Sequence, residues 1–314
     1  MTTPSAIRAT GLRKQYGGTA ALDGFDLTVP PGAIHGLLGP NGAGKSTAVG
    51  ILTTLRRADA GEASIAGFDV RRQGAEVRRR IGLVGQAHAV DEILGGRQNL
   101  VMFARLAGLA PAAARARADE LLERFGLLEA AGKPASQYSG GMRRRLDIAI
   151  ALLLSPAVLF LDEPTTGLDP RGRAEVWDAV REIADRGTAV LLTTQYLDEA
   201  DRMAARISVL RRGTVVAEGT PGELKRSIGG DRVEVTPSDP AMFDAAAAAV
   251  RTAIGAEATV DRELGVVTAP ALDGPAATIA VLRALDEAGI EIADLELRRP
   301  TLDDVFLTLT KEAA

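Results

Sequence analysis

Hydrophobic residues along the first two thirds of the chain follow the patterns that β-strands and amphipathic helices produce. Alternating or β-branched side chains bounded by Gly and Pro predict strands at 7–12, 22–29 and 62–65. Short, mostly apolar runs predict buried strands at 33–38, 158–161 and 189–193. Further predicted elements are helices at 46–54, 171–185 and 197–203 and strands at 207–210 and 214–218. This alternation indicates an α/β core with a mainly parallel sheet.

The pattern changes character twice. Residues 91–130 are rich in Ala, Leu and Arg with apolar spacing near that of a helix, and 112–125 predicts an amphipathic helix. We therefore expect a helical subdomain at about 87–157. After Gly229-Gly230, a plausible linker, the predicted order is strand, helix, strand, strand, helix, strand, followed by a short helix at 302–309. That order is the split β-α-β-β-α-β arrangement, so 1–228 and 229–314 are expected to be separate domains.

The segment between the strand at 33–38 and the helix at 46–54 carries the strongest chemical signal. It fits G-x-x-x-x-G-K-[ST] at every fixed position, with the run Gly39, Pro40, Asn41, Gly42, Ala43, Gly44, Lys45, Ser46 and Thr47. Glycines let backbone N–H groups wrap a phosphate, and the helix N-terminus adds partial positive charge. Lys45 is expected to reach the β- and γ-phosphates and the Ser46 hydroxyl to hold Mg²⁺. The sequence predicts a nucleoside triphosphate site.

Two carboxylates follow the apolar strand at 158–161. Asp162 and Glu163 stand at its carboxyl end, where the second half of a phosphate-loop site belongs. Asp162 is expected to act on Mg²⁺, and Glu163 to act as general base toward the attacking water. The alternative is a capped strand end with two solvated acids.

A third element, Ser139-Gly140-Gly141, lies between the phosphate loop and the carboxylates. Ser139 can cap a helix that begins there, which leaves that helix's N–H groups free to meet an anion. A Ser-Gly-Gly turn alone is weak evidence for an anion site. Between a phosphate loop and a carboxylate pair, in this order along the chain, it is strong evidence.

Together these residues resemble the ATP-binding-cassette family of ATPases, over residues 1 to about 228. The resemblance implies a P-loop core with β-rich and helical subdomains, and a head-to-tail homodimer in which Ser139, Gly140 and Gly141 of one subunit close on ATP held by the other. It also implies an adenine contact for Tyr16, a link between Mg²⁺, water and a membrane partner for Gln86, and a contact with the opposite subunit for Asp169. For Tyr16 simple packing, and for Gln86 a solvated loop position, remain alternatives.

One position departs from the family pattern. Most members place a histidine against the γ-phosphate after the strand at 189–193, and this chain has Gln195. A Gln amide can donate a hydrogen bond to a phosphate oxygen, but it cannot gain or lose a proton. Any base role then falls to Glu163, with Gln195 sensing or positioning.

Three segments, 195–200, 138–147 and 300–307, narrow the resemblance to the ATP-binding subunits of daunorubicin/doxorubicin-resistance-type exporters, over nearly the full length. That branch implies a multi-span permease on a separate chain, efflux of a drug or antibiotic-like molecule, a peripheral location on the cytoplasmic face of the membrane, and a small ferredoxin-like C-terminal domain. The longest uncharged apolar stretch, 148–161, is too short to cross a bilayer.

Composition bounds the competing functions. The absence of cysteine rules out disulfides and thiolate metal sites, and the net charge of −4 argues against nucleic acid as a partner. A soluble ATPase of the same superfamily, not coupled to transport, is the main alternative. A drug-sequestering protein is a weaker one, because residues 231–314 offer no recognisable pocket. The arginine run at 143–145 reads as a solvated face or a dimer contact, and His35 and His88 read as structural.

Overall fold

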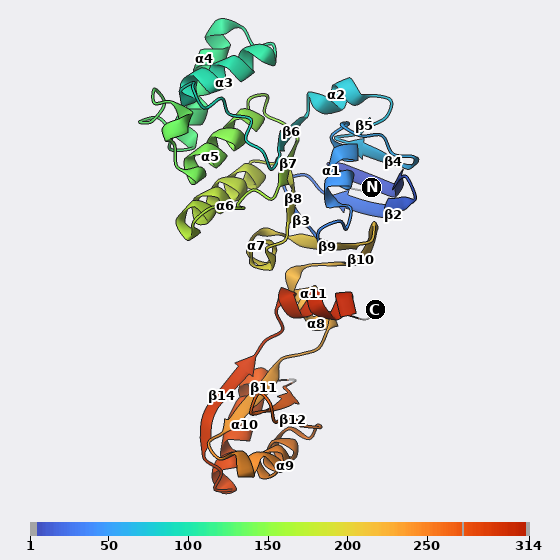
Figure 1. Ribbon diagram of the computed structural model, residues 1–314, viewed down its shortest axis with the longest axis vertical. Helices are drawn as coiled ribbons and strands as arrows, with labels where there is room; N and C mark the ends of the chain where they lie inside the picture. Colours follow the sequence, from blue (N-terminus) through green and yellow to red (C-terminus); the bar gives the residue numbers. More distant parts are fainter. Residues whose placement is uncertain (1–4, 272, 312–314) are drawn as a thin grey trace. The chain divides into compact units, whose positions relative to one another are not determined.

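The computed structural model describes residues 5–271 and 273–311 of the chain (Figure 1). Contacts divide it into two compact units, Met1–Pro221 and Gly222–Ala314. The division lies a few residues before the expected Gly229-Gly230 linker, because most of helix α8 (Pro221–Ser227) is grouped with the second unit.

A central sheet organises the first unit. Its strand order is β10-β9-β3-β8-β7-β6. The strands are β6 (Ile81–Val84), β7 (Val158–Asp162), β8 (Ala189–Thr194), β3 (Ile34–Leu38), β9 (Arg206–Arg211) and β10 (Thr214–Gly219). All neighbours are parallel except β9 and β10. The sheet is covered on both faces, which explains why its central strands are continuous apolar runs rather than alternating ones.

Successive residues of these strands enter two different cores, because side chains alternate across a sheet. In β7, Leu159 and Leu161 face the core that the helices cover, whereas Phe160 belongs to the core shared with the antiparallel sheet. In β8, Leu192 faces the core that the helices cover, and Leu191 faces the core shared with the antiparallel sheet. The site described below is therefore built on strands that are held from both sides.

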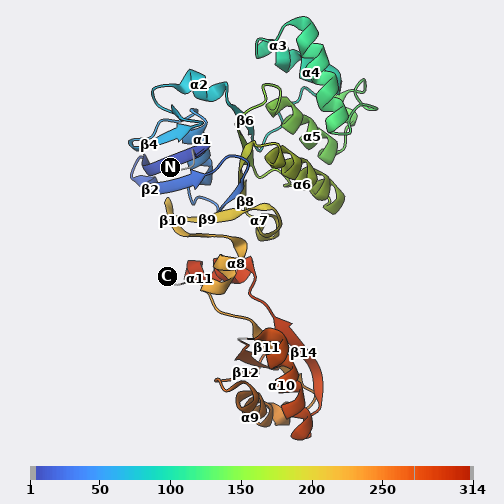
Figure 2. The same cartoon turned by 180° about the vertical axis from the view of Figure 1, so that it is seen from behind.

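The antiparallel sheet has the order β2-β1-β4-β5. Its strands are β1 (Ile7–Tyr16), β2 (Thr19–Val29), β4 (Ala60–Ile65) and β5 (Phe68–Asp69), and its neighbours are α1 (Lys45–Leu52) and α2 (Gly74–Arg78). The opposite side of the first unit is helical, as both views show (Figure 2). It comprises α3 (Gly96–Leu106), α4 (Pro111–Arg124), η1 (Ala135–Gln137), α5 (Gly140–Ala151) and α6 (Pro170–Asp185). Helix α7 (Leu197–Met203) follows β8.

The second unit has the predicted β-α-β-β-α-β order. Its elements are β11 (Arg232–Pro237), η2 (Pro240–Met242), α9 (Phe243–Ile254), β12 (Thr259–Asp261), β13 (Val266–Pro270), α10 (Gly274–Glu287), β14 (Ile292–Arg298) and α11 (Leu302–Lys311). The sheet order β12-β13-β11-β14 is antiparallel throughout, so the expected ferredoxin-like arrangement is confirmed.

No helix among the described residues is both long enough and apolar enough to cross a membrane.

Candidate active site

The site is created by the order of four parallel strands. Strands β3, β8, β7 and β6 are consecutive neighbours in the sheet. Their last residues are in register, with Leu38 opposite Thr194 and Asp162 opposite Thr193. Since parallel strands end at the same edge of a sheet, the loops that follow them meet there. This edge therefore brings together the phosphate loop, the carboxylate pair, the Gln195 turn and the segment containing Gln86.

The lysine of the phosphate loop donates hydrogen bonds to the backbone of that loop. Lys45 begins α1 and is buried, and its Nζ donates to the carbonyls of Gly39 at 2.7 Å and Pro40 at 3.2 Å. Gly44 has φ +112°, and a Cβ there would lie 2.3 Å from the carbonyl oxygen of Ala21, so only glycine fits. The loop residues that are exposed are Pro40, Asn41, Gly42 and Ser46, whereas Ala43 and Thr47 are buried.

The charges of Asp162 and Glu163 affect the pKa of Lys45. Burial lowers the pKa of Lys45 below its ordinary value, and the negative charges of Glu163 and Asp162 act against that shift. The three side chains therefore influence one another across the ends of β3 and β7. An ammonium that donates to two loop carbonyls, with two carboxylates acting on it from the neighbouring strand end, is suited to receiving a polyphosphate.

Asp162 and Glu163 are held differently although they are adjacent. Thr193 Oγ1 of β8 donates to Asp162 Oδ1, which fixes that carboxylate at the strand end. Glu163 has φ +49°, a left-handed conformation that non-glycine residues rarely adopt. Its N–H donates to the Thr193 carbonyl at 3.0 Å. The carboxylate expected to act as base thus sits on a constrained turn.

A cavity of about 330 Å³ lies beside this turn. Gln86, Glu163 and Gly140 all line it, so the glutamine after β6, the candidate base and the start of α5 share one space. Ser139 is absent from this lining. The structure thus brings Gln86 and Glu163 together.

Ser139 and Asp169 both act as helix caps. Ser139 Oγ accepts from the Met142 N–H at 3.2 Å at the start of α5, as expected. Asp169 Oδ1 accepts from the Gly172 N–H at 2.8 Å at the start of α6. A Cβ on Gly141 would lie 3.2 Å from Gly172 Cα, so the two helix starts approach closely.

Tyr16 and Gln195 lie at the ends of their strands with accessible side chains. Tyr16 closes β1 and is 45% exposed, and its hydroxyl accepts from Arg56 Nη1 at 2.7 Å. The Lys14 ammonium also lies over its ring, 5.4 Å from the centroid. Gln195 follows β8 directly and is exposed. Both residues are exposed, although the Lys14 and Arg56 cations lie over the Tyr16 ring.

The turn that carries Gln195 is fixed by a buried carboxyl that sequence reasoning did not single out. Glu199 in α7 accepts from Thr194 Oγ1 at 2.7 Å and from Trp177 Nε1 at 3.3 Å. Thr194 Oγ1 in turn accepts from the Tyr196 N–H at 2.9 Å. Burial raises the pKa of Glu199. The acid within 195–200 was visible in the sequence, but not its burial.

The arginine run at 143–145 is not simply a solvated face, so that expectation was wrong for Arg144. Its side chain is 3% exposed and donates only to backbone carbonyls. One turn further along α5, the buried Asp147 contacts His88 Nδ1 and accepts from the Ala89 N–H at 3.0 Å. Helix α5 is therefore attached to the loop after β6.

The donor set at the strand ends suits a hard divalent cation. The Ser46 hydroxyl, the Gln86 amide oxygen and the Asp162 carboxylate are oxygen donors, the class that Mg²⁺ prefers. Within 5–271 and 273–311, no group of three or more His, Cys, Asp or Glu side chains is placed to hold a metal by itself.

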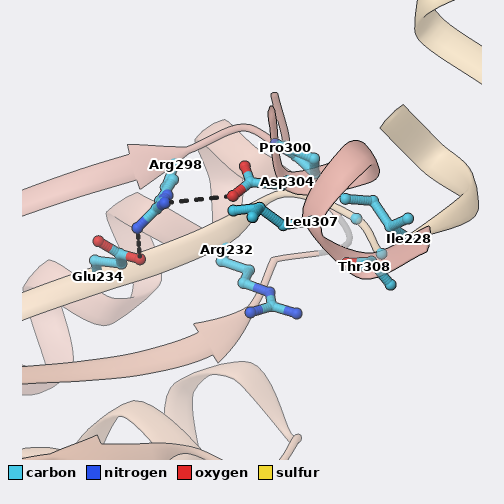
Figure 3. Close-up of a pocket in the computed structure, with 10 residues that line it drawn as sticks. Ile228, Arg232, Glu234, Arg298, Pro300, Asp304, Leu307 and Thr308 are labelled. Carbon is cyan, nitrogen blue, oxygen red and sulfur yellow. Dashed lines mark hydrogen bonds and ion pairs between the residues drawn. The ribbon is translucent and has the colours of Figure 1, made fainter. Parts of the chain in front are cut away.

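A second cavity, of about 270 Å³, lies within the second unit, so the expectation of no pocket there was wrong (Figure 3). It is lined by β11, the end of β14 and α11. Arg298 is bound on both sides, to Glu234 at 3.2 Å and to Asp304 at 3.6 Å. The cavity is smaller than a site that encloses a drug-sized molecule usually is, and paired charges occupy part of its wall.

Comparisons with known proteins agree with the geometry. Residues 22–166 match the ABC transporter family, and residues 219–310 match the C-terminal domain of DrrA1-3-like ATP-binding proteins. The chain is 56% identical over 99% of both sequences to the daunorubicin resistance ATP-binding protein DrrA3 of Streptomyces coeruleorubidus. It is 50% identical to the doxorubicin resistance ATP-binding protein DrrA of Mycobacterium tuberculosis, over 98% of this chain and 94% of that one.

Solved structures of ATP-binding cassettes match about 70% of the chain. One is cbiO1 of Clostridium perfringens, part of an ABC transporter complex, with TM-score 0.66 and 28% identity over 71% of this chain and 93% of that one. Another is a dimeric ATP-binding cassette in a post-hydrolysis state bound to ADP and Pi, with TM-score 0.61 and 25% identity over 68% and 98%. These matches confirm the expected cassette fold.

Proposed function

The chain belongs to the ATP-binding-cassette transporter ATPases, in the daunorubicin/doxorubicin-resistance branch, and on that premise we propose that it powers drug efflux through a separate permease. Members of this family bind and hydrolyse ATP. The observation that carries the proposal is the meeting at one sheet edge of four loops, which bring the phosphate loop with Lys45 to the same edge as Asp162 and Glu163.

We assign the hydrolytic roles within this edge as follows. Lys45 binds the β- and γ-phosphates after exchanging its contacts with the Gly39 and Pro40 carbonyls. Glu163 accepts a proton from the water that attacks the γ-phosphorus, while the bond to the β-phosphate oxygen breaks to leave ADP and phosphate. Gln195 donates its amide N–H to a γ-phosphate oxygen.

Mg²⁺ binding falls to the oxygen donors at the same edge. Ser46, Gln86 and Asp162 would hold the ion, and when bound it neutralises charge on the β- and γ-phosphate oxygens. The Thr193 hydroxyl orients Asp162 for this purpose. Gln86 shares its cavity with Glu163, which supports a second role for Gln86 in positioning the attacking water.

The remaining predicted residues are assigned to adenine and to a second subunit. Tyr16 offers an exposed ring for stacking. Ser139, Gly140 and Gly141 start α5 with its N-terminal N–H groups, which suits the γ-phosphate of ATP held by the opposite subunit. Asp169 caps the neighbouring helix α6. We propose that they act in a head-to-tail homodimer.

Coupling to transport requires a partner in the membrane. The relatives are named for daunorubicin and doxorubicin resistance, so we propose a drug or antibiotic-like cargo, a multi-span permease on another chain, and a peripheral location at the cytoplasmic face of the membrane. Closure of the ATP-bound dimer and reopening after hydrolysis would drive the permease.

The hydrolytic roles are tested by steady-state ATPase assays on two variants. Glu163→Gln should lower turnover by about 10²–10⁴-fold and trap bound ATP, because the amide cannot accept the water proton. Gln195→Ala should slow turnover only about tenfold, the cost of one hydrogen bond. Undiminished hydrolysis by Glu163→Gln would overturn the assignment.

The transport role is tested by membrane fractionation. The chain is expressed with and without the product of its neighbouring gene. Recruitment to the membrane only in its presence supports a two-component exporter. A chain that stays in the soluble fraction in both cases would favour an ATPase that is not coupled to transport.

A further inference from the structure

Arg144 links helix α5 to two of the loops at the sheet edge. Its Nη1 donates to the Gly85 carbonyl at 2.8 Å, after β6. Its Nε donates to the Pro164 carbonyl at 2.6 Å. Its Nη2 donates to the carbonyls of Asp162 at 3.2 Å and Glu163 at 3.0 Å, after β7. A single buried guanidinium therefore holds the backbone of both loops.

The carbonyls that Arg144 binds belong to, or adjoin, residues with assigned chemistry. Gly85 directly precedes Gln86, and the other loop carries the carboxylates of Asp162 and Glu163. The left-handed turn at Glu163 is held from two directions, at its N–H by Thr193 and at its carbonyl by Arg144. Rare backbone conformations persist only where the surroundings over-determine them.

A planar fork is needed for this arrangement. Guanidinium N–H groups diverge in one plane and can reach several carbonyls at once, whereas a lysine ammonium is a point charge on a flexible stem. Burial lowers the pKa of Arg144, while Asp147, Asp162 and Glu199 favour its charged form. The cation is therefore held by carbonyl dipoles and nearby carboxylates together.

We propose that Arg144 is a positioning residue for ATP hydrolysis. It holds the loops that carry Glu163 and Gln86 in fixed positions relative to each other and to the start of α5. The proposal rests on the roles assigned above to Glu163 and Gln86. Helix α5 also carries Gly140 into the shared cavity, so a displacement of that helix reaches both loops through one side chain. Asp147 adds a second attachment at Ala89.

The test compares Arg144→Met and Arg144→Lys with a matched control, Arg117→Met. Arg117 in α4 is also a largely buried arginine that donates to backbone carbonyls, those of Leu152 at 2.7 Å and Leu153 at 3.3 Å. These carbonyls lie beyond the other end of α5. The full chain is assayed for kcat and KM with Mg-ATP, for affinity with a fluorescent ATP analogue, and for its urea unfolding midpoint.

Arg144→Met should lower kcat about 10²-fold, the usual effect of displacing a catalytic group by about 1 Å. KM and analogue affinity should change less than about threefold, because Lys45 and its loop stay in place. The kcat of Arg144→Lys should lie between that of Arg144→Met and that of the wild type. Arg117→Met should lose stability yet keep kcat within about twofold.

Two results would overturn the proposal. One is a folded Arg144→Lys or Arg144→Met protein with wild-type kcat. The other is a fall in analogue affinity as large as the fall in kcat, which would place Arg144 in support of nucleotide binding instead. Glu163→Gln is assayed in parallel, so wild-type hydrolysis by that variant identifies failure of the proposed base separately from failure of Arg144.

Discussion

Protonation of a buried histidine should make the first unit sensitive to mild acid. His35 lies in β3, is 1% exposed, and shares a hydrogen bond of 2.8 Å with Ser208 Oγ. Burial, aided by the charge of Arg206, lowers the pKa of His35 from 6.5 to about 4. The native state therefore keeps the imidazole neutral at a pH where the unfolded chain binds a proton.

The sign and size follow from linkage. Because the unfolded state binds more protons between pH 6.5 and about 4, the free energy of unfolding falls as the pH falls through that window. With 1.36 kcal/mol for each pKa unit, the loss is about 2 kcal/mol by pH 5 and about 3 kcal/mol by pH 4. Above pH 7 the imidazole is neutral in both states, so it no longer changes the free energy of unfolding with pH.

The assay measures urea unfolding at several pH values between 7.5 and 5, with tryptophan fluorescence as the signal. The chain has one tryptophan, Trp177, and it lies in the first unit with His35. His35→Gln is the control, since it keeps a polar side chain but does not titrate. Carboxyl groups, including Glu199, titrate equally in both proteins and cancel in the comparison.

The wild type should lose about 2 kcal/mol more than His35→Gln between pH 7.5 and 5. Equal pH dependence of the two proteins would refute the reasoning, because it would mean that the imidazole titrates alike in the folded and unfolded states.

Two further predictions test the architecture of the site, the first with a matched control. Gly44→Ala should abolish nucleotide binding in a binding titration and cost at least about 2 kcal/mol in urea unfolding, from its left-handed φ and overlap with the Ala21 carbonyl. Gly17→Ala, with φ +57° and open space around its Cβ, should cost only about 1 kcal/mol, and similar losses for both would contradict the steric argument. Trp177→Phe should cost about 1–2 kcal/mol, because Glu199 loses a buried donor. Circular dichroism measures this change, and an unchanged midpoint would contradict it.

Much of the fold could be predicted because its central strands have distinctive patterns. The apolar runs at 158–161 and 189–193 became β7 and β8, and the C-terminal strand–helix order was confirmed element by element. Short elements were missed, including β5 and α2. Two- and five-residue elements are too brief to establish a periodicity.

The phosphate loop, the carboxylates after β7 and the capping Ser139 were set by local chemistry, which is why the sequence alone determined them. Each depends on a residue type that its own backbone turn or strand end requires, as the left-handed φ of +112° at Gly44 illustrates. The roles assigned to these residues, and those of Tyr16, Gln86, Gln195 and Asp169, stay predictions until they are assayed.

Tertiary structure alone decided which arginine of 143–145 is buried. Successive helical residues point about 100° apart, so the three face different surroundings. Arg143 reaches Glu92, Arg145 reaches Glu175, and only Arg144 turns toward the strand ends. The burial of Glu199 and the pairing of His35 with Ser208 likewise depend on elements distant in sequence. Sequence specifies what each residue can do, whereas packing decides which groups lie within reach of one another.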